Sequence, residues 1–297
     1  MGSPEPAAVV LDEVMRAGHD VAVVVTRPDK RRSRSAAPAP TPVKALAERC
    51  AIPVEYTPQG CLGYGADLGI VVAYGKIIPT DVLSALDMIN VHFSLLPRWR
   101  GAAPVERALL AGDDTTGVCL MKVEEGLDTG PLYRKAELAI QPSDTAAELT
   151  DRLAKLGAKL LVAALAEGLG NPEPQVGEPT YAAKLTSADL ELDWSRPAIE
   201  LERVVRVGRA WTTWRGERLL VLDATALPGQ GRPGQLDGDI VFAGEGALRL
   251  VEVQPQSKRP MDAASWLRGT RPGPDEILGA APRPGPRGAA ETSGSSS

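Results

Sequence analysis

Met88-Ile89-Asn90-Val91-His92-Phe93 (residues 88–93) is a mainly apolar run of strand length that carries two polar side chains. Similar apolar runs occupy residues 21–25, 68–73 and 117–123, and each predicts a buried strand. Helical patterns alternate with these runs, at residues 7–17, 43–49, 81–86 and 105–110. The alternation predicts an α/β fold with a doubly wound, mostly parallel, Rossmann-like sheet.

A longer helix is predicted to begin after Thr145. Thr145 and Glu148 have the spacing of a capping box, in which each residue satisfies a backbone N–H of the first turn. Leucines then recur at helical spacing and predict one buried stripe, formed by Leu149, Leu153, Leu156 and Leu160.

The composition changes after this helix, which indicates a second domain. Residues 170–187 are rich in Pro, Gly and Glu, so we expect a linker there, after a first domain at 1–169. A helix at 198–207 and short strands separated by Gly/Pro turns predict a domain at 188–279, a small β-sandwich or, as we prefer, an OB-like β-barrel. Residues 280–297 have little apolar content and predict a disordered tail.

The overall composition excludes several classes of protein. The 297 residues carry a formal net charge of −5, so bulk charge does not draw the chain to nucleic acid. No apolar run approaches the ~20 residues of a membrane-spanning helix, and the N-terminal residues lack the pattern of a signal peptide. Cys50, Cys61 and Cys119 lie far apart, which argues against a disulfide scaffold or a thiolate zinc site and favours a cytoplasmic protein.

Three polar residues are candidates for catalysis. Asn90 and His92 project from the same face of the predicted strand, at the carboxyl end where open α/β sheets bind ligands. An Asn amide can donate to a developing oxyanion, and a His side chain can exchange a proton near neutral pH. Asp128 stands in the loop Gly126-Leu127-Asp128-Thr129-Gly130, and a carboxylate beside His92 would orient the ring. Each signal alone is typical of a structural residue, whereas the combination favours a catalytic site.

A basic segment is the strongest sign of a polyanionic partner. It contains Arg27, Lys30, Arg31, Arg32 and Arg34 against the single acid Asp29. Such side chains can contact phosphates, although a charge run of this kind also occurs in ordinary solvated loops. Lys184 is a weaker candidate for the same role.

At this point the residues resemble a family. Asn-Val-His-x-Ser-Leu-Leu-Pro-Arg-Trp-Arg-Gly-Ala-Ala-Pro at 90–104, together with Gly-Leu-Asp-Thr-Gly at 126–130, is similar to the methionyl-tRNA formyltransferases, which are folate-dependent formyltransferases. Tyr-Ala-Ala-Lys-Leu at 181–185 and Ala-Trp-Thr-Thr-Trp-Arg-Gly at 210–216 extend the resemblance to nearly the whole chain, to about residue 279.

The resemblance implies a function and a role for each candidate residue. The chain would transfer a formyl group from 10-formyltetrahydrofolate to the amino group of initiator methionyl-tRNA, as a monomer and without a metal. Asn90 would bind the formyl oxygen, His92 would shuttle the proton of the amine, and Asp128 would hold His92. The folate would lie against Ser94, Leu95, Leu96 and Pro97. The tRNA would contact Arg27, Lys30, Arg31, Arg32, Arg34 and Lys184.

Two departures from the family pattern keep alternatives open. The first strand of the sheet is missing from this sequence, and Phe93 replaces the glycine that usually follows the His. A formyltransferase acting on a small amine, such as a sugar nucleotide, is one alternative, although the basic segment and the second domain argue against it. A catalytically inactive folate-binding or RNA-binding paralogue is the other, and the two departures favour it.

Overall fold

The structure is a computed structural model of the chain, and it describes residues 1–31, 37–274 and 276–279. The chain divides into two compact units, Met1–Leu185 and Thr186–Ser297. The predicted tail at 280–297 lies outside the described residues. The domain limits expected from the sequence, including the linker at 170–187, stay a prediction.

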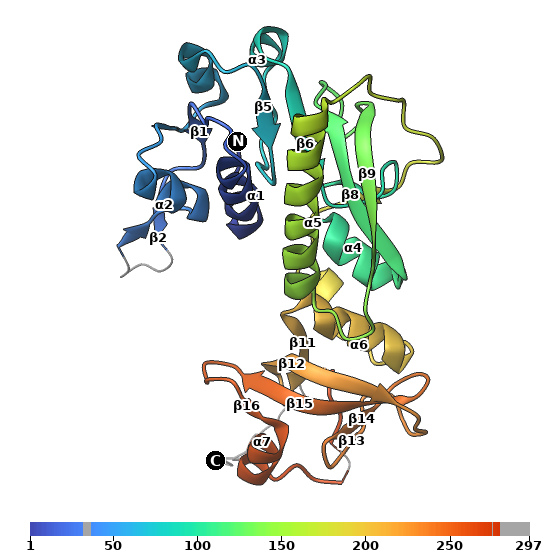
Figure 1. Cartoon of the computed structure of the whole chain (residues 1–297). Coiled ribbons are helices and arrows are strands. Elements are labelled where there is room, and N and C mark those ends of the chain that lie inside the picture. Colours follow the sequence, from blue (N-terminus) through green and yellow to red (C-terminus); the bar gives the residue numbers. More distant parts are fainter. Residues whose placement is uncertain (32–36, 275, 280–297) are drawn as a thin grey trace, which may run out of the picture. The chain divides into compact units, whose positions relative to one another are not determined.

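The first unit alternates helices and strands in the way the sequence pattern indicates (Figure 1). Its elements are α1 (Glu5–Arg16), β1 (Val24–Val25), β2 (Lys30–Arg31), β3 (Pro38–Ala39), α2 (Pro42–Arg49), β4 (Val54–Glu55), the 3₁₀-helix η1 (Pro58–Tyr64), β5 (Gly69–Val71), α3 (Thr80–Ala85), β6 (Met88–His92), β7 (Arg100–Gly101), α4 (Pro104–Ala111), β8 (Thr115–Lys122), β9 (Leu132–Ala139), α5 (Ala146–Glu167) and β10 (Tyr181–Ala182).

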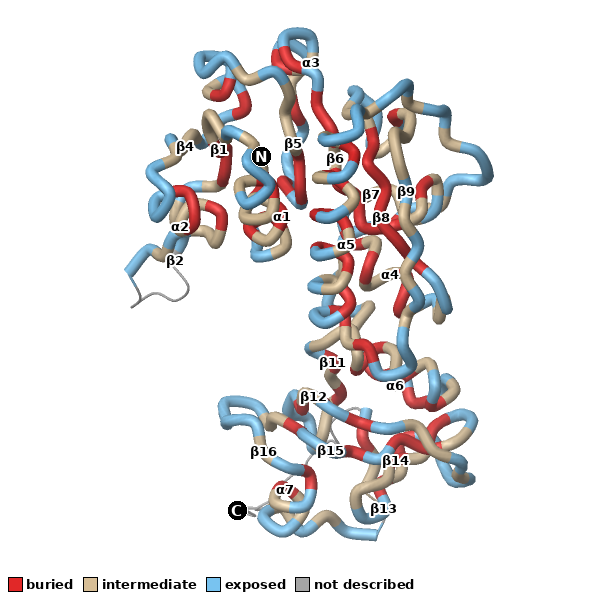
Figure 2. The backbone as a smooth tube through the Cα atoms, in the orientation of Figure 1, coloured by how far each residue is buried: buried red, intermediate tan, exposed pale blue. Residues whose placement is uncertain are grey.

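The main sheet of this unit has the strand order β5-β6-β8-β9. β5 pairs with β6 in parallel, and β1 pairs with β4 in parallel in a separate ladder. These pairings and the alternation of elements confirm the α/β fold. β8 and β9 were not expected to run antiparallel, yet β8 pairs antiparallel with both β6 and β9. β6 and β8 are buried along most of their length, as Figure 2 shows.

The first residues of the chain lie between β1 and β5. The Gly2 N–H donates to the Val25 carbonyl at 3.0 Å, and the Val72 N–H donates to the Met1 carbonyl at 2.9 Å. Met1 and Gly2 therefore connect the β1–β4 ladder to the sheet that begins with β5. They occupy the position that a central strand has in a doubly wound sheet. The strand predicted at 21–25 is shorter than expected, because only Val24 and Val25 pair with another strand, which is β4.

Helix α5 packs against the main sheet at a glycine. The capping box is present, with the Thr145 hydroxyl accepting from the Glu148 N–H and the Glu148 carboxylate accepting from the Thr145 N–H. A Cβ on Gly157 would lie 2.7 Å from Val91 Cγ1, so only glycine allows the helix to approach β6 this closely. Leu149 and Leu153 are buried as predicted, but Leu156 and Leu160 are only half-buried. The predicted stripe is therefore wrong in its second half, where Gly157 and Leu161 are buried instead.

The second unit is built on an antiparallel sheet with the order β11-β12-β15-β14-β13, to which β16 adds beside β15. Its elements are the 3₁₀-helix η2 (Ala188–Leu190), α6 (Ala198–Val207), β11 (Ala210–Trp214), β12 (Glu217–Leu227), β13 (Leu236–Asp237), β14 (Ile240–Phe242), β15 (Ala247–Pro255), β16 (Met261–Asp262) and α7 (Ala263–Thr270). A separate β-rich unit is thus confirmed. Among the described residues the ladder does not close on itself, so the predicted OB-like barrel is found as an open sheet.

Candidate active site

Strand β6 brings Asn90 and His92 to one place. The strand is buried at four of its five positions, and Asn90 is the half-buried exception. Asn90 pairs with Val71 of β5 and Met121 of β8, and His92 pairs with Cys119 of β8. Because alternate side chains share a face of the sheet, Asn90 and His92 point the same way. Burial raises the pKa of the Cys119 thiol to about 11, so this neighbour of His92 stays uncharged at neutral pH.

The loop after β8 delivers Asp128 to the same place. One carboxylate oxygen of Asp128 accepts from the Gly101 N–H at 2.8 Å and lies 3.8 Å from His92 Nδ1. The other accepts from Asn90 Nδ2 at 3.4 Å. The amide of Asn90 and the ring of His92 therefore both lie beside the Asp128 carboxylate, although Asp128 follows Asn90 by 38 residues. The three side chains predicted to be catalytic are thus close together. Their role in catalysis stays a prediction.

Glycine allows the loop to return tightly over β8. A Cβ on Gly130 would lie 1.9 Å from the Lys122 carbonyl oxygen, so any other residue would push the loop away. Asp128 itself has a φ of 50°, a left-handed conformation that few residues other than Gly, Asn and Asp adopt. The Asp128 side chain is 14% exposed, which leaves its carboxylate accessible from one side.

The ring of His92 is held by a backbone carbonyl. His92 Nε2 lies 3.0 Å from the Trp99 carbonyl oxygen. A carbonyl can only accept, so this contact places a proton on Nε2 and leaves Nδ1 to face Asp128. At 3.8 Å from the carboxylate, Nδ1 can take up a proton that Asp128 then stabilises.

Trp99 is fixed on both its backbone and its side chain. Its N–H donates to the Thr180 hydroxyl at 2.9 Å, and its indole N–H donates to Asp113 at 2.8 Å. The Arg98 guanidinium stacks 4.4 Å from the centre of the indole and forms an ion pair with Asp113, which raises the pKa of Arg98. The carbonyl that orients His92 is thus held rigidly.

The residues predicted to bind folate occupy the turn between β6 and Trp99. Ser94 is fully buried, and its hydroxyl donates to the Arg98 carbonyl at 2.6 Å. Leu96 is buried against Cys119 and Met121, whereas Leu95 and Pro97 are half-buried. The structure places these four residues beside His92 along the chain, and their contact with folate stays a prediction.

The basic residues predicted to contact tRNA differ in their surroundings. Arg27 is half-buried and donates to the Tyr74 carbonyl at 3.4 Å, whereas Lys30 and Lys184 are exposed. Asp29 is bound by Lys44 of α2 at 2.8 Å, a contact that raises the pKa of Lys44. Arg31 lies in β2, and Arg32 and Arg34 lie outside the described residues. Within the described part, exposed positive charge remains at Lys30 and Lys184, and their role stays a prediction.

Sequence reasoning missed the groups that complete the site. The Gly101 N–H and the Trp99 carbonyl are backbone groups, which every residue except proline carries in full, so no side-chain pattern distinguishes them. Gln175 was also missed, since it lies in a Pro-rich segment without periodicity. Its amide contacts the backbone of the Asp128 loop.

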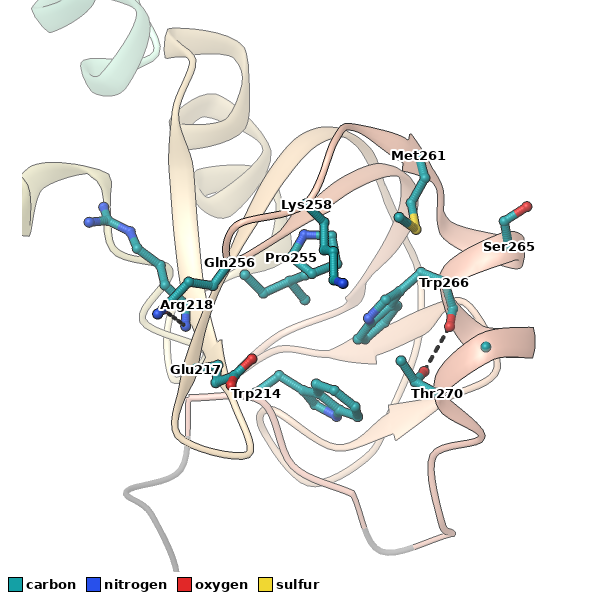
Figure 3. Close-up of a pocket in the computed structure, with 12 residues that line it drawn as sticks. Trp214, Glu217, Arg218, Pro255, Gln256, Lys258, Met261, Ser265, Trp266 and Thr270 are labelled. Atoms are coloured by element: carbon teal, nitrogen blue, oxygen red, sulfur yellow. Dashed lines mark hydrogen bonds between the residues drawn. The ribbon is translucent and has the colours of Figure 1, made fainter. Parts of the chain in front are cut away.

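The second unit contains a pocket that includes none of the predicted site residues (Figure 3). Its volume is about 430 Å³. Trp214 and Trp266 meet edge to face in it, with their ring centres 5.3 Å apart. The pocket is lined by Trp214, Glu217, Arg218, Leu219, Pro255, Gln256, Lys258, Met261, Ser265, Trp266, Gly269 and Thr270.

Neither a metal-binding cluster nor a membrane-spanning helix is found in the described part of the chain. No group of three or more His, Cys, Asp or Glu side chains there could hold a metal ion. In the same residues, no helix has the length and apolar character needed to span a bilayer.

Comparisons with known proteins identify the family whose fold this chain shares. Residues 1–165 match the family described as "Formyl transferase", and residues 184–271 match "Formyl transferase, C-terminal domain". The chain belongs to the formyl transferase family.

Two curated relatives of this chain are named methionyl-tRNA formyltransferase. A methionyl-tRNA formyltransferase of Dinoroseobacter shibae is 43% identical over 288 residues, which cover 91% of this chain and 96% of the relative. A methionyl-tRNA formyltransferase of a Methylobacterium species is 44% identical over 297 residues, covering 91% of this chain and 95% of the relative.

Solved structures of lower identity share the fold. An N-formyltransferase from Helicobacter canadensis, in complex with folinic acid and dTDP-3-aminofucose, aligns with a TM-score of 0.64 at 15% identity, over 84% of this chain and 97% of that one. Methionyl-tRNA formyltransferase from Clostridium thermocellum aligns with a TM-score of 0.53 at 21% identity, over 59% of this chain and 81% of that one. At these identities the likeness shows the fold alone.

Proposed function

We propose that this chain transfers a formyl group from 10-formyltetrahydrofolate to the amino group of initiator methionyl-tRNA, the step that prepares the tRNA for translation initiation. Family membership and relatives of more than 40% identity support the reaction and the acceptor. The observation that carries the chemistry is the meeting of Asn90, His92 and Asp128 around one carboxylate.

The residues divide the reaction between them. The folate donor supplies the formyl group. Asn90 donates its amide N–H to the formyl oxygen while negative charge develops there, as the amine nitrogen bonds to the formyl carbon. At 3.4 Å its present bond to Asp128 is long, so the amide can turn to a substrate at little cost.

His92 moves the proton that this step releases. Its Nε2 is held by the Trp99 carbonyl, so Nδ1 accepts the proton of the attacking amine. Asp128 stabilises the resulting imidazolium across 3.8 Å. His92 then returns the proton to the folate nitrogen as the bond between that nitrogen and the formyl carbon breaks. The products are formyl-methionyl-tRNA and tetrahydrofolate, and no proton is gained or lost overall.

The same proposal assigns the binding partners, the cellular compartment and the oligomeric state. Ser94, Leu95, Leu96 and Pro97 line the folate site, and the positive charges at Lys30, Arg32, Arg34 and Lys184 contact tRNA phosphates, with Arg27 and Arg31 at the root of the basic segment. We place the protein in the cytoplasm as a monomer. All three cysteines are free thiols, which supports a reducing compartment.

A panel of acceptors tests the function. Purified protein is given 10-formyltetrahydrofolate with initiator methionyl-tRNA, free methionine or an amino-sugar nucleotide, and formylated product is quantified by mass spectrometry. We expect rapid formylation of the charged tRNA alone. Preference for the amino sugar would favour the small-amine alternative. No transfer to any acceptor, with folate binding intact by calorimetry, would favour an inactive paralogue.

A further inference from the structure

The side-chain amide of Gln175 uses all of its hydrogen-bonding capacity beside the candidate active site. Its Nε2 donates to the Asp128 carbonyl at 2.9 Å and to the Gly130 carbonyl at 2.8 Å. Its Oε1 accepts from the Arg100 guanidinium, from Nε at 3.1 Å and from Nη2 at 2.7 Å. An amide has two N–H groups and two acceptor lone pairs, so four such bonds fix its position and its orientation.

The groups that Gln175 binds lie on both sides of the hydrogen bond between Gly101 and Asp128. The Gly101 N–H, which directly follows Arg100, donates to the Asp128 carboxylate at 2.8 Å. Gln175 holds Arg100 on one side of that bond and the backbone of Asp128 on the other. Gln175 therefore links the side chain of the residue before Gly101 to the backbone of Asp128, and its hydrogen bonds include neither the carboxylate nor the His92 ring.

The Asp128 loop needs such support. Asp128 adopts a left-handed φ of 50°, a conformation that Asp tolerates better than most residues but adopts less readily than glycine. The preceding residue, Leu127, is 63% exposed, so its side chain contributes little packing to the loop. Hydrogen bonds from Gln175, Gly101 and Asn90 hold the loop from outside.

Gln175 reaches the loop from a segment that is otherwise turned to solvent. Val176 is 87% exposed and Glu178 is exposed, whereas Gln175 is half-buried. The segment is fastened on either side of Gln175. Glu173 exchanges two backbone hydrogen bonds with Leu132, at 2.7 and 2.8 Å, and Thr180 binds Trp99 and Arg100 through its hydroxyl and its carbonyl. Hydrogen bonds thus attach the segment to Leu132 before Gln175 and to Trp99 and Arg100 after it.

We infer that Gln175 is a positioning residue for formyl transfer: it sets the orientation of the Asp128 carboxylate toward His92 by holding the Asp128–Gly130 backbone and Arg100 together. This inference rests on the proposed function, because it assigns Gln175 to the same reaction. It predicts that Gln175 acts on the rate of the chemical step and not on substrate affinity, since the amide is directed to protein groups with all four of its bonds.

Two variants separate the contacts of the amide. Gln175→Met keeps the length of the side chain and removes every hydrogen bond. Gln175→Glu keeps the acceptor for Arg100, so the segment stays attached, but it directs an oxygen at the two carbonyls in place of the two N–H donors. Glu178→Ala, three residues away and exposed, is the matched control.

Steady-state formylation of methionyl-tRNA is measured for each protein. We expect kcat to fall ~10–100-fold in both Gln175 variants, as is typical when a group that orients a functional residue is lost. The KM values for folate and tRNA should stay within ~2-fold of the parent, and Glu178→Ala should match the parent. A KM change with kcat unchanged would overturn the inference.

A second readout does not depend on turnover. The chain has two histidines, His19 and His92, so the His92 ring signals can be followed by NMR with His19 as internal reference. We expect the Gln175 variants to shift the His92 signals and their pH titration, leaving those of His19 unchanged. Unchanged His92 signals in a folded Gln175→Glu protein would overturn the inference. Shifted signals in a protein whose parent transfers no formyl group would instead refute the proposed function and leave the positioning role standing.

Discussion

The loop that carries Asp128 and the segment that carries the basic residues both follow a strand, but they are held in different ways. Asp128 is bound by Asn90, Gly101 and Gln175, which come from three other parts of the chain. In its described part the basic segment is held through Arg27, through the ion pair of Asp29 with Lys44 and through the pairing of β2 with β3, and Lys30 is exposed. Acid–base chemistry requires fixed distances, whereas contact with a phosphate backbone requires charge within reach.

This difference predicts two kinds of kinetic effect. Changes around Asp128 should lower the rate of the chemical step and leave the binding of tRNA unaffected. Changes in the basic segment should weaken tRNA binding in a salt-dependent way and leave the chemical step unaffected. The predictions below test whether the two regions separate in this manner.

Replacing Asp128 with Asn should have the largest effect. The change keeps the shape of the side chain, and with it a place for the Gly101 N–H, but removes the negative charge 3.8 Å from His92 Nδ1. We expect kcat to fall on the order of 10³-fold or more, as when the carboxylate that supports a catalytic histidine is neutralised. Single-turnover formylation at saturating tRNA measures the effect.

Asp114→Asn is the matched control for this change, because Asp114 is exposed and carries the same charge. It should leave the single-turnover rate unchanged. A rate loss of less than ~10-fold in Asp128→Asn would show that the carboxylate does not support a proton transfer. The claim that the Asp128 loop governs the chemical step would then be wrong.

Replacing Asn90 with Ala should have the next largest effect. The amide N–H is the donor that we assign to the formyl oxygen, and loss of one such donor costs on the order of 10²–10³ in kcat. The exposed Asn171→Ala is the control. Measured in the same single-turnover assay, a fall in affinity for folate at an unchanged rate would mean that Asn90 binds the ground state and does not stabilise the developing charge.

Much of this arrangement could be predicted from the sequence, because the residues involved leave local signals. Asn90 and His92 interrupt an apolar run at the end of a strand, and Asp128 stands between two glycines after the next buried run. The capping box at Thr145 and the helix over Ala198–Val207 were expected from equally local patterns, and both are confirmed. Such features depend on neighbours within about four residues.

The features that were missed depend on residues far apart in the chain. β9 carries Arg134, Lys135 and Glu137 on a half-buried strand, so it lacks the apolar run that marked the other strands. β11 and α7 were also not expected. On α5, Gly157 and Leu161 are buried while Leu156 and Leu160 are half-buried, and the helix sequence alone does not show how closely Gly157 approaches β6. Gln175 lies 47 residues from Asp128 and 75 from Arg100, and nothing near it in the sequence indicates either contact.

Removing positive charge from the basic segment should have a moderate effect of the other kind. The triple change Lys30→Ala, Arg32→Ala and Arg34→Ala should raise the KM for methionyl-tRNA on the order of 10-fold at physiological salt, because phosphate contacts contribute most of such affinity. The slope of log KM against log salt should become less steep by up to ~3, about 1 for each charge that contacts a phosphate.

A matched triple variant shows whether position matters as well as charge. Lys135→Ala, Lys155→Ala and Lys159→Ala removes the same number of charges from exposed positions on β9 and α5. It should leave both the KM and the salt slope nearly unchanged. Equal effects of the two triple variants would mean that tRNA responds to net charge only, and the basic segment would lose its special role.

The smallest effect is expected at Lys184, and it gives the finest test of the comparison. Lys184 is exposed, but its backbone is held, since the preceding Ala183 carbonyl accepts from Arg107 at 3.1 Å and Ala182 pairs with Gly101. It therefore combines a fixed position close to the candidate active site with a free charge. If charge alone determines its role, Lys184→Gln should raise the KM for tRNA ~2-fold and Lys184→Glu somewhat more, both at unchanged kcat and with a salt slope reduced by about 1 or less. If Lys184→Gln lowers kcat instead, then Lys184 acts on the chemical step through its backbone neighbours. The boundary between a fixed catalytic region and a charged binding region would then have to be moved to include the residues around β10.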